Sequence, residues 1–276
     1  NPSTAPFIFS IKQTGVPVGG VIAGALLPVF VELFGWRGAL VCAASMALVL
    51  ALILQPFRAE FDSDRQPERS LKLTDLRATL GAVLHDARVR ELALGLFAFT
   101  GLQLAFASFF VSFLSLGMGW TLTDAGIAYS VAMGAGIAGR LIWGWVGSRY
   151  VPPILLLAIL GLVMGLACMA IGLVDASWQQ PAVWAVVFTY GLTGIGYQGV
   201  LLAEIARIAP PGMAGVVTGG AVFFAYMGMI TFPGSFGLIL ALTDSYQTAF
   251  VILGAVPIIV GAMLFRSARR QKTQAS

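Results

Sequence analysis

Arg140 is the one basic residue that lies deep inside an apolar stretch of the sequence. It precedes Arg149, at the end of the same stretch, by nine residues, and a helical rise of about 1.5 Å per residue places it roughly 13 Å deeper. A cation at such a depth in a membrane faces a bundle interior or a water-filled cavity and pairs with another group. A guanidinium fork suits a carboxylate, so Arg140 is a candidate anion-binding residue. The alternative is a structural arginine that bonds to carbonyl groups or extends to the interface.

Polar side chains also recur in two other apolar stretches. Thr100 and Gln103 fall on one helical face, as do Tyr190 and Tyr197, with Gln198 beside the latter. Hydroxyl and amide groups need partners in lipid, so such helices should face protein or water. We expect most of these groups to bond between helices and some of them to contact a substrate.

Other chemistries are poorly supported. The two cysteines, Cys42 and Cys168, lie inside apolar runs without a CxxC pair, and His85 is the single histidine. These residues favour neither a disulfide framework nor a metal site. The sequence also lacks a GxSxG elbow, a phosphate-binding Gly-Lys-Ser/Thr loop and an HExxH motif. We therefore expect no enzyme activity, no metal and no cofactor.

The composition is that of a membrane protein. The chain has 276 residues, of which 58% are hydrophobic and 10% charged, and its mean hydropathy is +0.90. A soluble domain carries about 25% charged residues, so an ordinary soluble enzyme is excluded. Eight apolar segments are long enough to span a bilayer and predict an all-α membrane protein, a polytopic bundle of eight transmembrane helices. These segments are 14–34, 38–57, 92–116, 125–145, 152–174, 181–203, 213–242 and 249–265.

The basic residues predict an orientation. Fourteen of the sixteen Lys and Arg residues fall on the side of the two chain ends, Arg37 falls on the other side, and Arg140 lies within a span. Because positive residues accumulate in cytoplasmic loops, both termini are predicted to be cytoplasmic. The basic residues are spread over several loops and a tail, which argues against a nucleic-acid surface.

A charged loop at 58–91 divides the apolar segments. Five apolar residues recur in it at helical spacing: Leu73, Leu76, Leu80, Val83 and Leu84. They predict an amphipathic helix on the cytoplasmic surface, and the alternative is a solvated linker. The chain then divides into two helices at 1–57, the linker at 58–91, six helices at 92–266 and a basic tail at 267–276.

Small residues in the spans allow helix backbones to approach closely, because lipid supplies no hydrophobic drive between helices. Pro17 supplies a bend, and Pro233 is predicted to break or kink the seventh segment. These residues could act in gating or serve only in helix packing. The glycines concerned are Gly15, Gly19, Gly20, Gly24, Gly136, Gly139 and Gly144.

Two runs of residues resemble the major facilitator superfamily. Gly15 to Gly20, with Gly24, resembles its Gly/Pro-rich fifth helix, and the run from Gly136 to Arg149 resembles its eighth helix and the cytoplasmic loop after it. The resemblance covers nearly the whole chain and implies a partial fold that corresponds to family helices five to twelve of the usual twelve. Residues 1–57 would then hold the last two helices of the N-terminal half, and residues 92–266 the complete C-terminal half.

The resemblance also implies roles for single residues. In monocarboxylate and oxalate transporters of this superfamily, an arginine at the place of Arg140 is understood to hold a substrate carboxylate. Lys12 matches a lysine before the Gly/Pro run in related carriers and could meet an anion that enters from the cytoplasm, or could lie at the interface.

The cytoplasmic loop departs from the family pattern, because Ser148 stands where the family usually has Asp. This change weakens any prediction of a salt-bridge latch. Arg149 could instead meet Glu204, which has Arg207 three residues further on. These three residues would form a gate or only a cluster that anchors the topology.

We therefore predict a secondary active transporter that works by alternating access on a small organic anion such as a carboxylate. It would lie in a bacterial-type inner (plasma) membrane. Its partners would be the small-molecule substrate, the lipid bilayer and the missing N-terminal helices, or another chain that supplies them. The alternatives are a truncated, non-transporting membrane scaffold and an exporter of lipophilic drugs.

Overall fold

The computed structural model describes residues 13–58, 79–81, 83–175 and 177–275. Within these ranges every regular element is a helix, which confirms the all-α fold class. Lys12, Leu73 and Leu76 lie outside the described residues. An amphipathic helix was predicted within the loop 58–91. The described residues 79–81 and 83–85 of this loop are helical, and Val83 is fully buried.

From α5 onwards the helices follow one another along the chain with short connections. Two of the elements, η2 and η3, are π-helices. The elements α8, η3 and α9 together form one interrupted span. In chain order the elements are α2 (Gly15–Leu54), η1 (Gln55–Phe57), α5 (Ala87–Ser112), η2 (Phe113–Gly117), α6 (Leu122–Arg149), α7 (Pro153–Gly172), α8 (Gln180–Tyr190), η3 (Gly191–Ile195), α9 (Gln198–Ile208), α10 (Ala214–Thr243) and α11 (Tyr246–Ala275).

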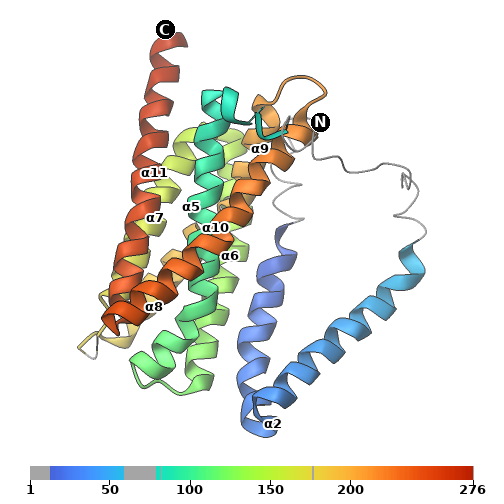
Figure 1. The fold of residues 1–276 in the computed structure, drawn as a ribbon, viewed down its shortest axis with the longest axis vertical. Helices are drawn as coiled ribbons and strands as arrows, with labels where there is room; N and C mark the ends of the chain where they lie inside the picture. Colours follow the sequence, from blue (N-terminus) through green and yellow to red (C-terminus); the bar gives the residue numbers. More distant parts are fainter. Residues whose placement is uncertain (1–12, 59–78, 82, 176, 276) are drawn as a thin grey trace.

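Helix α2 is bent at Gly35. This residue has φ 69° and ψ 172°, a conformation that glycine adopts without the steric cost of a Cβ atom. The bend divides α2 into two arms that diverge in Figure 1. Seven segments of the described chain are long and apolar enough to cross a membrane, and the first of them, Gly15–Phe57, includes both arms. The predicted number of eight spans is therefore not confirmed, because the first two predicted spans form one bent element.

Helix α10 is not broken at Pro233 as predicted. It is one continuous helix from Ala214 to Thr243 with Pro233 inside it. A proline removes one backbone hydrogen bond, and in a helix of 30 residues the remaining bonds keep the helix together. The helix ends at Asp244, whose left-handed backbone (φ 52°, ψ 30°) stops the helical repeat.

Side chains cap the two helices that carry Thr100, Gln103 and Arg140. The Asp86 carboxylate accepts hydrogen bonds from the N–H groups of Arg88 at 2.7 Å and Val89 at 3.2 Å, at the start of α5. The Thr121 hydroxyl accepts one from the N–H group of Asp124 at 3.0 Å, at the start of α6. These bonds satisfy N–H groups that have no partner within the first turn of a helix.

The helices α5 to α11 form one bundle around a shared apolar core (Figure 1). Helix α11 packs on α7, and α10 packs on α5. Aromatic rings fill the centre, where the ring of Phe106 lies 4.3 Å from the rings of both Phe110 and Tyr190. Helix α2 joins this bundle mainly through α6, and its second arm is almost wholly exposed. The core therefore lies in the bundle that begins at α5.

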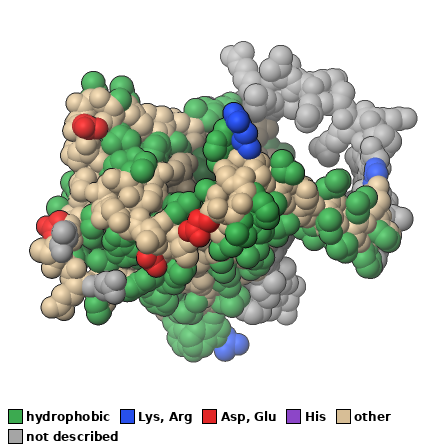
Figure 2. All heavy atoms as spheres, turned by 90° about the horizontal axis from the view of Figure 1, so that it is seen from below, with side chains coloured by type: hydrophobic (Ala, Val, Ile, Leu, Met, Phe, Trp, Pro, Cys, Tyr) green, Lys and Arg blue, Asp and Glu red, His purple; other side chains and the backbone are tan. Residues whose placement is uncertain are grey.

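The outer surface is largely apolar. Figure 2 views the end of the molecule that lies opposite the C-terminus, where acidic side chains are scattered among hydrophobic ones and basic side chains are isolated. Many large hydrophobic side chains along the helices are exposed, among them Leu33, Trp36, Leu166, Ile230 and Ile259. An exposed apolar surface of this extent is expected where a protein meets lipid.

Only two of the four glycines predicted in the first apolar segment lie at the contact between α2 and α6. A Cβ atom added at Gly20 or Gly24 would collide with side chains of α6. At Gly15 and Gly19, by contrast, no described atom lies within 4 Å of such a Cβ. Pro17 is buried. One glycine pair therefore packs against α6, while the other faces away from the described helices.

Helix α6 and the π-helix η3 cross with their backbones in contact. A Cβ atom at Gly139 would collide with the carbonyl oxygen of Leu192, and one at Gly136 would collide with the side chain of Ile195. Gly144, further along α6, is also buried. The crossing brings the α6 side chains that flank it directly against the carbonyl groups of η3.

We expect Gly139→Ala to lower the free energy of unfolding by about 1–3 kcal/mol, because overpacking at a backbone contact forces the helices apart. The control is Gly134→Ala on the same helix, where no described atom lies within 4 Å of the new Cβ. This change should be neutral or slightly stabilising. Thermal unfolding of the purified variants in detergent compares the two, and equal melting temperatures would contradict the close crossing.

Candidate functional site

Arg140 is completely buried, and two neutral acceptors hold its guanidinium group. The Nε atom donates to the carbonyl oxygen of Ile195 at 3.0 Å, and one terminal nitrogen donates to the amide oxygen of Gln198 at 3.0 Å. The other terminal nitrogen, NH1, is buried without a hydrogen-bond partner. Arg140 thus bonds to one backbone carbonyl and one side-chain amide, and its NH1 nitrogen has no hydrogen-bond partner in the described part of the chain.

The acceptor at Ile195 exists because the span is interrupted. A π-helix shifts the backbone hydrogen-bond pattern, so some carbonyl groups lose their usual helical partner. Helix α6 supplies two donors here: Arg140 bonds to Ile195, and the indole N–H of Trp143 donates to the carbonyl oxygen of Leu192 at 2.7 Å. Arg140 and Trp143 are three residues apart and lie on the same face of α6. This face of α6 therefore stabilises the interruption.

The predicted polar residues of α5 meet the interrupted span next to Arg140. The hydroxyl groups of Thr100 and Tyr197 lie 2.8 Å apart in a buried hydrogen bond, and the Tyr197 hydroxyl donates to the amide oxygen of Gln103 at 3.4 Å. The Tyr190 hydroxyl donates to the carbonyl oxygen of Leu102 at 3.3 Å. The structure thus brings Thr100, Gln103 and Tyr197 together, with Tyr197 adjacent in sequence to the Arg140 partner Gln198.

Arg140 has no carboxylate partner among the described residues. The charged side chains buried in these ranges are Arg140 and Glu204, and Glu204 is 4% exposed. Glu204 accepts two hydrogen bonds from Arg207, each 2.7 Å long, through both of its oxygens. Its charge is therefore compensated, whereas the positive charge of Arg140 is not. A buried charge of this kind attracts an opposite one.

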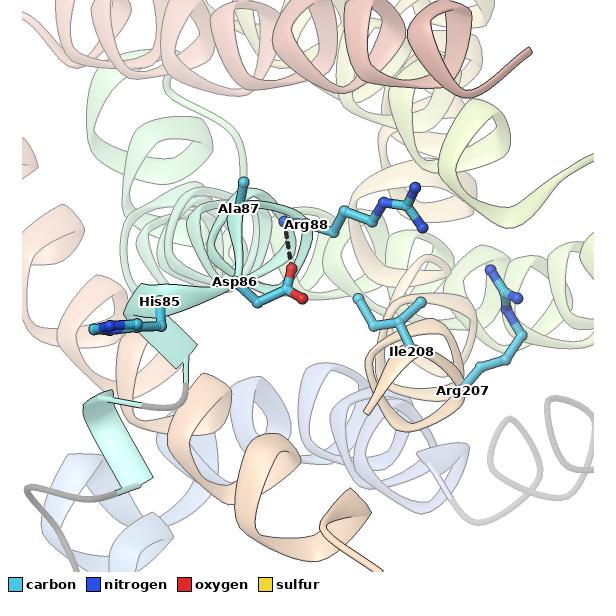
Figure 3. A pocket seen from close by; sticks show the side chains of 6 residues that line it. All are labelled: His85, Asp86, Ala87, Arg88, Arg207 and Ile208. Atoms are coloured by element: carbon cyan, nitrogen blue, oxygen red, sulfur yellow. Dashed lines mark hydrogen bonds between the residues drawn. The ribbon is translucent and has the colours of Figure 1, made fainter. Parts of the chain in front are cut away.

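The predicted contact between Arg149 and Glu204 is not formed. Arg207 lies one turn from Glu204 on the same helix and takes both carboxylate oxygens, while Arg149 is exposed at the end of α6. A cavity of about 510 Å³ opens beside this pair. In Figure 3 the guanidinium groups of Arg88 and Arg207 lie on the same side of the cavity, and His85 points the other way.

A second hollow lies between the two arms of α2. This apolar groove of about 790 Å³ is lined by small and branched side chains of both arms, including Gly19, Leu26, Ala43 and Leu50. Gly19 is one of the glycines that face away from the described helices. The groove has the lining expected of a surface that packs on further apolar helices.

The sequence did not predict the contacts of two residues of the site. Gln198 stood out only as a polar neighbour of Tyr197, and Trp143 did not stand out at all, because tryptophan is common in apolar segments. The interruption contains Gly191, Gly194 and Gly196, but the continuous helix α6 has an equally dense set at Gly134, Gly136 and Gly139, so glycine spacing alone does not indicate it.

A bundle of membrane-spanning helices with a buried, uncompensated arginine at a helix interruption defines the class of membrane transporters. The Major Facilitator Superfamily matches residues 1–233. This match covers most of the chain, and the chain therefore belongs to this superfamily, whose members are transporters and not enzymes. It is a multi-pass membrane protein.

Named relatives are similar to most of the chain. Human monocarboxylate transporter 11 is 29% identical over 271 residues, which cover 92% of this chain and 54% of that protein. The gentisate transporter of Corynebacterium glutamicum is 24% identical over 283 residues, which cover 96% of this chain and 60% of that protein. The chain thus spans somewhat more than half the length of these relatives.

A solved structure shows the same fold. The crystal structure of the Escherichia coli fucose:proton symporter FucP matches 96% of this chain and 70% of its own chain with a TM-score of 0.68. The sequence identity is 16%, so this likeness concerns the fold alone.

We expect Arg207→Ala to destabilise the protein, because it leaves the buried carboxylate of Glu204 without its partner. A loss of about 1–3 kcal/mol is expected, since one member of the pair is buried and the other is largely exposed. Arg149→Ala, the same change at an exposed position of α6, should leave the melting temperature within a degree or two, roughly the effect of a surface substitution. Similar losses in both variants would contradict the pairing described here.

Proposed function

We propose that this chain forms the larger part of a secondary active transporter that carries a small organic anion by alternating access. The observation that carries this proposal is the buried NH1 nitrogen of Arg140, which has no hydrogen-bond partner. A carboxylate oxygen that bonds to this nitrogen would satisfy the donor and compensate the charge in one contact. The relatives named for monocarboxylate and gentisate transport support the same class of substrate.

The residues around Arg140 suit a small substrate. The hydroxyl groups of Thr100 and Tyr197 and the amide of Gln103 bond to one another, and Tyr197 directly precedes Gln198 in the sequence; we propose that these groups bond to further oxygens of the substrate. Tyr190 adds an aromatic wall against Phe106. The chemistry is binding followed by conformational change, without a covalent step. Because Arg140 and both tyrosines are fully buried, the site must open for the substrate to enter and leave.

The proposed transporter contains more helices than the described bundle. We propose that each arm of α2 crosses the membrane, which gives eight spans with both chain ends in the cytoplasm. In this arrangement residues 1–57 belong to one half of the transporter, 58–91 link the halves, 92–266 form the second half and 267–276 a cytoplasmic tail. The apolar groove of α2 supports additional helices as its partners, from the same polypeptide or from another chain.

This groove also supports the alternative of a membrane scaffold. If no further helices cover α2, the chain would present a large apolar surface and would transport nothing by itself. The two functions differ in a direct measurement, which is uptake by proteoliposomes that contain the protein as its gene encodes it. Accumulation of a carboxylate supports the transporter and contradicts the scaffold.

We expect Arg140→Ala and Arg140→Lys to lower the uptake of radiolabelled gentisate and lactate by at least about tenfold. Alanine removes the charge, and lysine cannot hold the Ile195 carbonyl, the Gln198 amide and a carboxylate with one fixed fork. The matched control is Arg37 in the bend of α2, where the same two substitutions should leave uptake unchanged. Melting temperatures of all variants separate loss of transport from loss of fold.

Retained uptake of every anion in both Arg140 variants would overturn the proposed site. Uptake of tetraphenylphosphonium without uptake of any carboxylate would contradict an anion transporter and favour an exporter of lipophilic cations.

A further inference from the structure

Gln198 provides the one side-chain acceptor for Arg140 among the described residues. Its amide oxygen lies 3.0 Å from one terminal nitrogen of the guanidinium, next to the unpaired nitrogen NH1. The two terminal nitrogens share one carbon atom. A carboxylate bound at NH1 would therefore lie beside the amide of Gln198, and any charge at position 198 would act on it at short range.

The local fold fixes the position of this amide. Gln198 is the first residue of α9, directly after the interruption formed by η3, Gly196 and Tyr197. The Tyr197 hydroxyl is held by Thr100, and Gly139 of α6 packs against the backbone of Gly196. The start of α9 is thus held from both sides, and its first side chain is directed towards Arg140.

Charged residues are few on the elements α5 to α9, which surround this contact. Helix α9 has its first charged residue at Glu204, six residues and roughly 9 Å along the helix from Gln198, and that carboxylate is taken by Arg207. The elements α7, α8 and η3 contain no charged residue. The charged residues of α5 and α6 stand near the helix ends, at Arg88, Arg90, Glu91, Asp124 and Arg149.

We propose that Gln198 determines the charge of the substrate, and this inference rests on the anion site proposed above. The amide orients Arg140 through a hydrogen bond but adds no charge, so one positive charge remains for one carboxylate. A carboxylate at position 198 would form an ion pair with Arg140 and cancel this charge. An apolar side chain of similar length would remove the hydrogen bond and leave the charge. Gln198 is therefore a specificity-determining residue whose neutrality is the essential property.

The test compares the binding of an anion with that of its neutral amide. Equilibrium binding of gentisate, gentisamide, lactate and lactamide is measured on the purified protein as its gene encodes it, in Gln198→Glu, Gln198→Met and the unmodified protein. The unmodified protein should prefer each anion over its amide. Gln198→Glu should reduce this preference at least about tenfold, and Gln198→Met should keep the preference while it weakens the binding of both ligands.

Gln179→Glu is the matched control. It introduces the same change at the exposed residue before α8, in the loop that leads to the same span, and should keep both the affinity and the preference. Because the readout is a ratio between two ligands of nearly equal shape, a general structural loss would lower both affinities together and leave the ratio unchanged.

Two results would overturn the role of Gln198. One is a folded Gln198→Glu protein with an unchanged preference for the anions. The other is a folded Gln198→Met protein that loses the preference, and this variant decides the question if Gln198→Glu does not fold. An unmodified protein that binds gentisate and gentisamide equally would instead contradict the anion site itself.

Discussion

The structure depends on a constraint that the bilayer imposes: backbone polar groups within it must find partners inside the protein. The span α8–η3–α9 breaks its regular hydrogen-bond pattern in the middle of the bundle, and α6 compensates for this break. Arg140 and Trp143 donate to carbonyl oxygens of Ile195 and Leu192, and the glycine at 139 allows the two backbones to come close enough. Without these donors the interruption would leave carbonyl groups unsatisfied in an apolar environment, which is costly.

In the proposed transporter Arg140 combines two roles in one side chain. One edge of the guanidinium holds the interrupted span, and the remaining nitrogen is free for a ligand. An anion bound at the proposed site would contact the same group that fixes the start of α9, and substrate binding would then be coupled to the geometry of the span through a single planar unit. A lysine could carry the charge but not this geometry, because its ammonium is a point charge without a fork.

The sequence predicted the class of the fold well, because apolar segments, positive loops and a deep arginine are local signals. Thr100, Gln103 and Tyr197, whose positions predicted bonds between helices, do bond to one another across α5 and the interrupted span. The sequence could not predict the details that depend on how helices cross. Gln198 became a partner of Arg140 only because the span is interrupted before it, and α10 continues as one helix through Pro233, where a break or kink was expected. The separation between segments 14–34 and 38–57, which the sequence did indicate, is a bend at Gly35, where the backbone conformation needs glycine.

The bend at Gly35 sets the direction of the second arm of α2 relative to the first arm. The arm from residue 36 to residue 54 is about 28 Å long at about 1.5 Å per residue, and it departs from the first arm at a single residue with non-helical dihedral angles. A rotation of about 10° at this residue would displace the far end of the arm by about 5 Å. Small torsional changes at one glycine therefore suffice to widen or close the groove between the arms, while the first arm keeps its contact with α6.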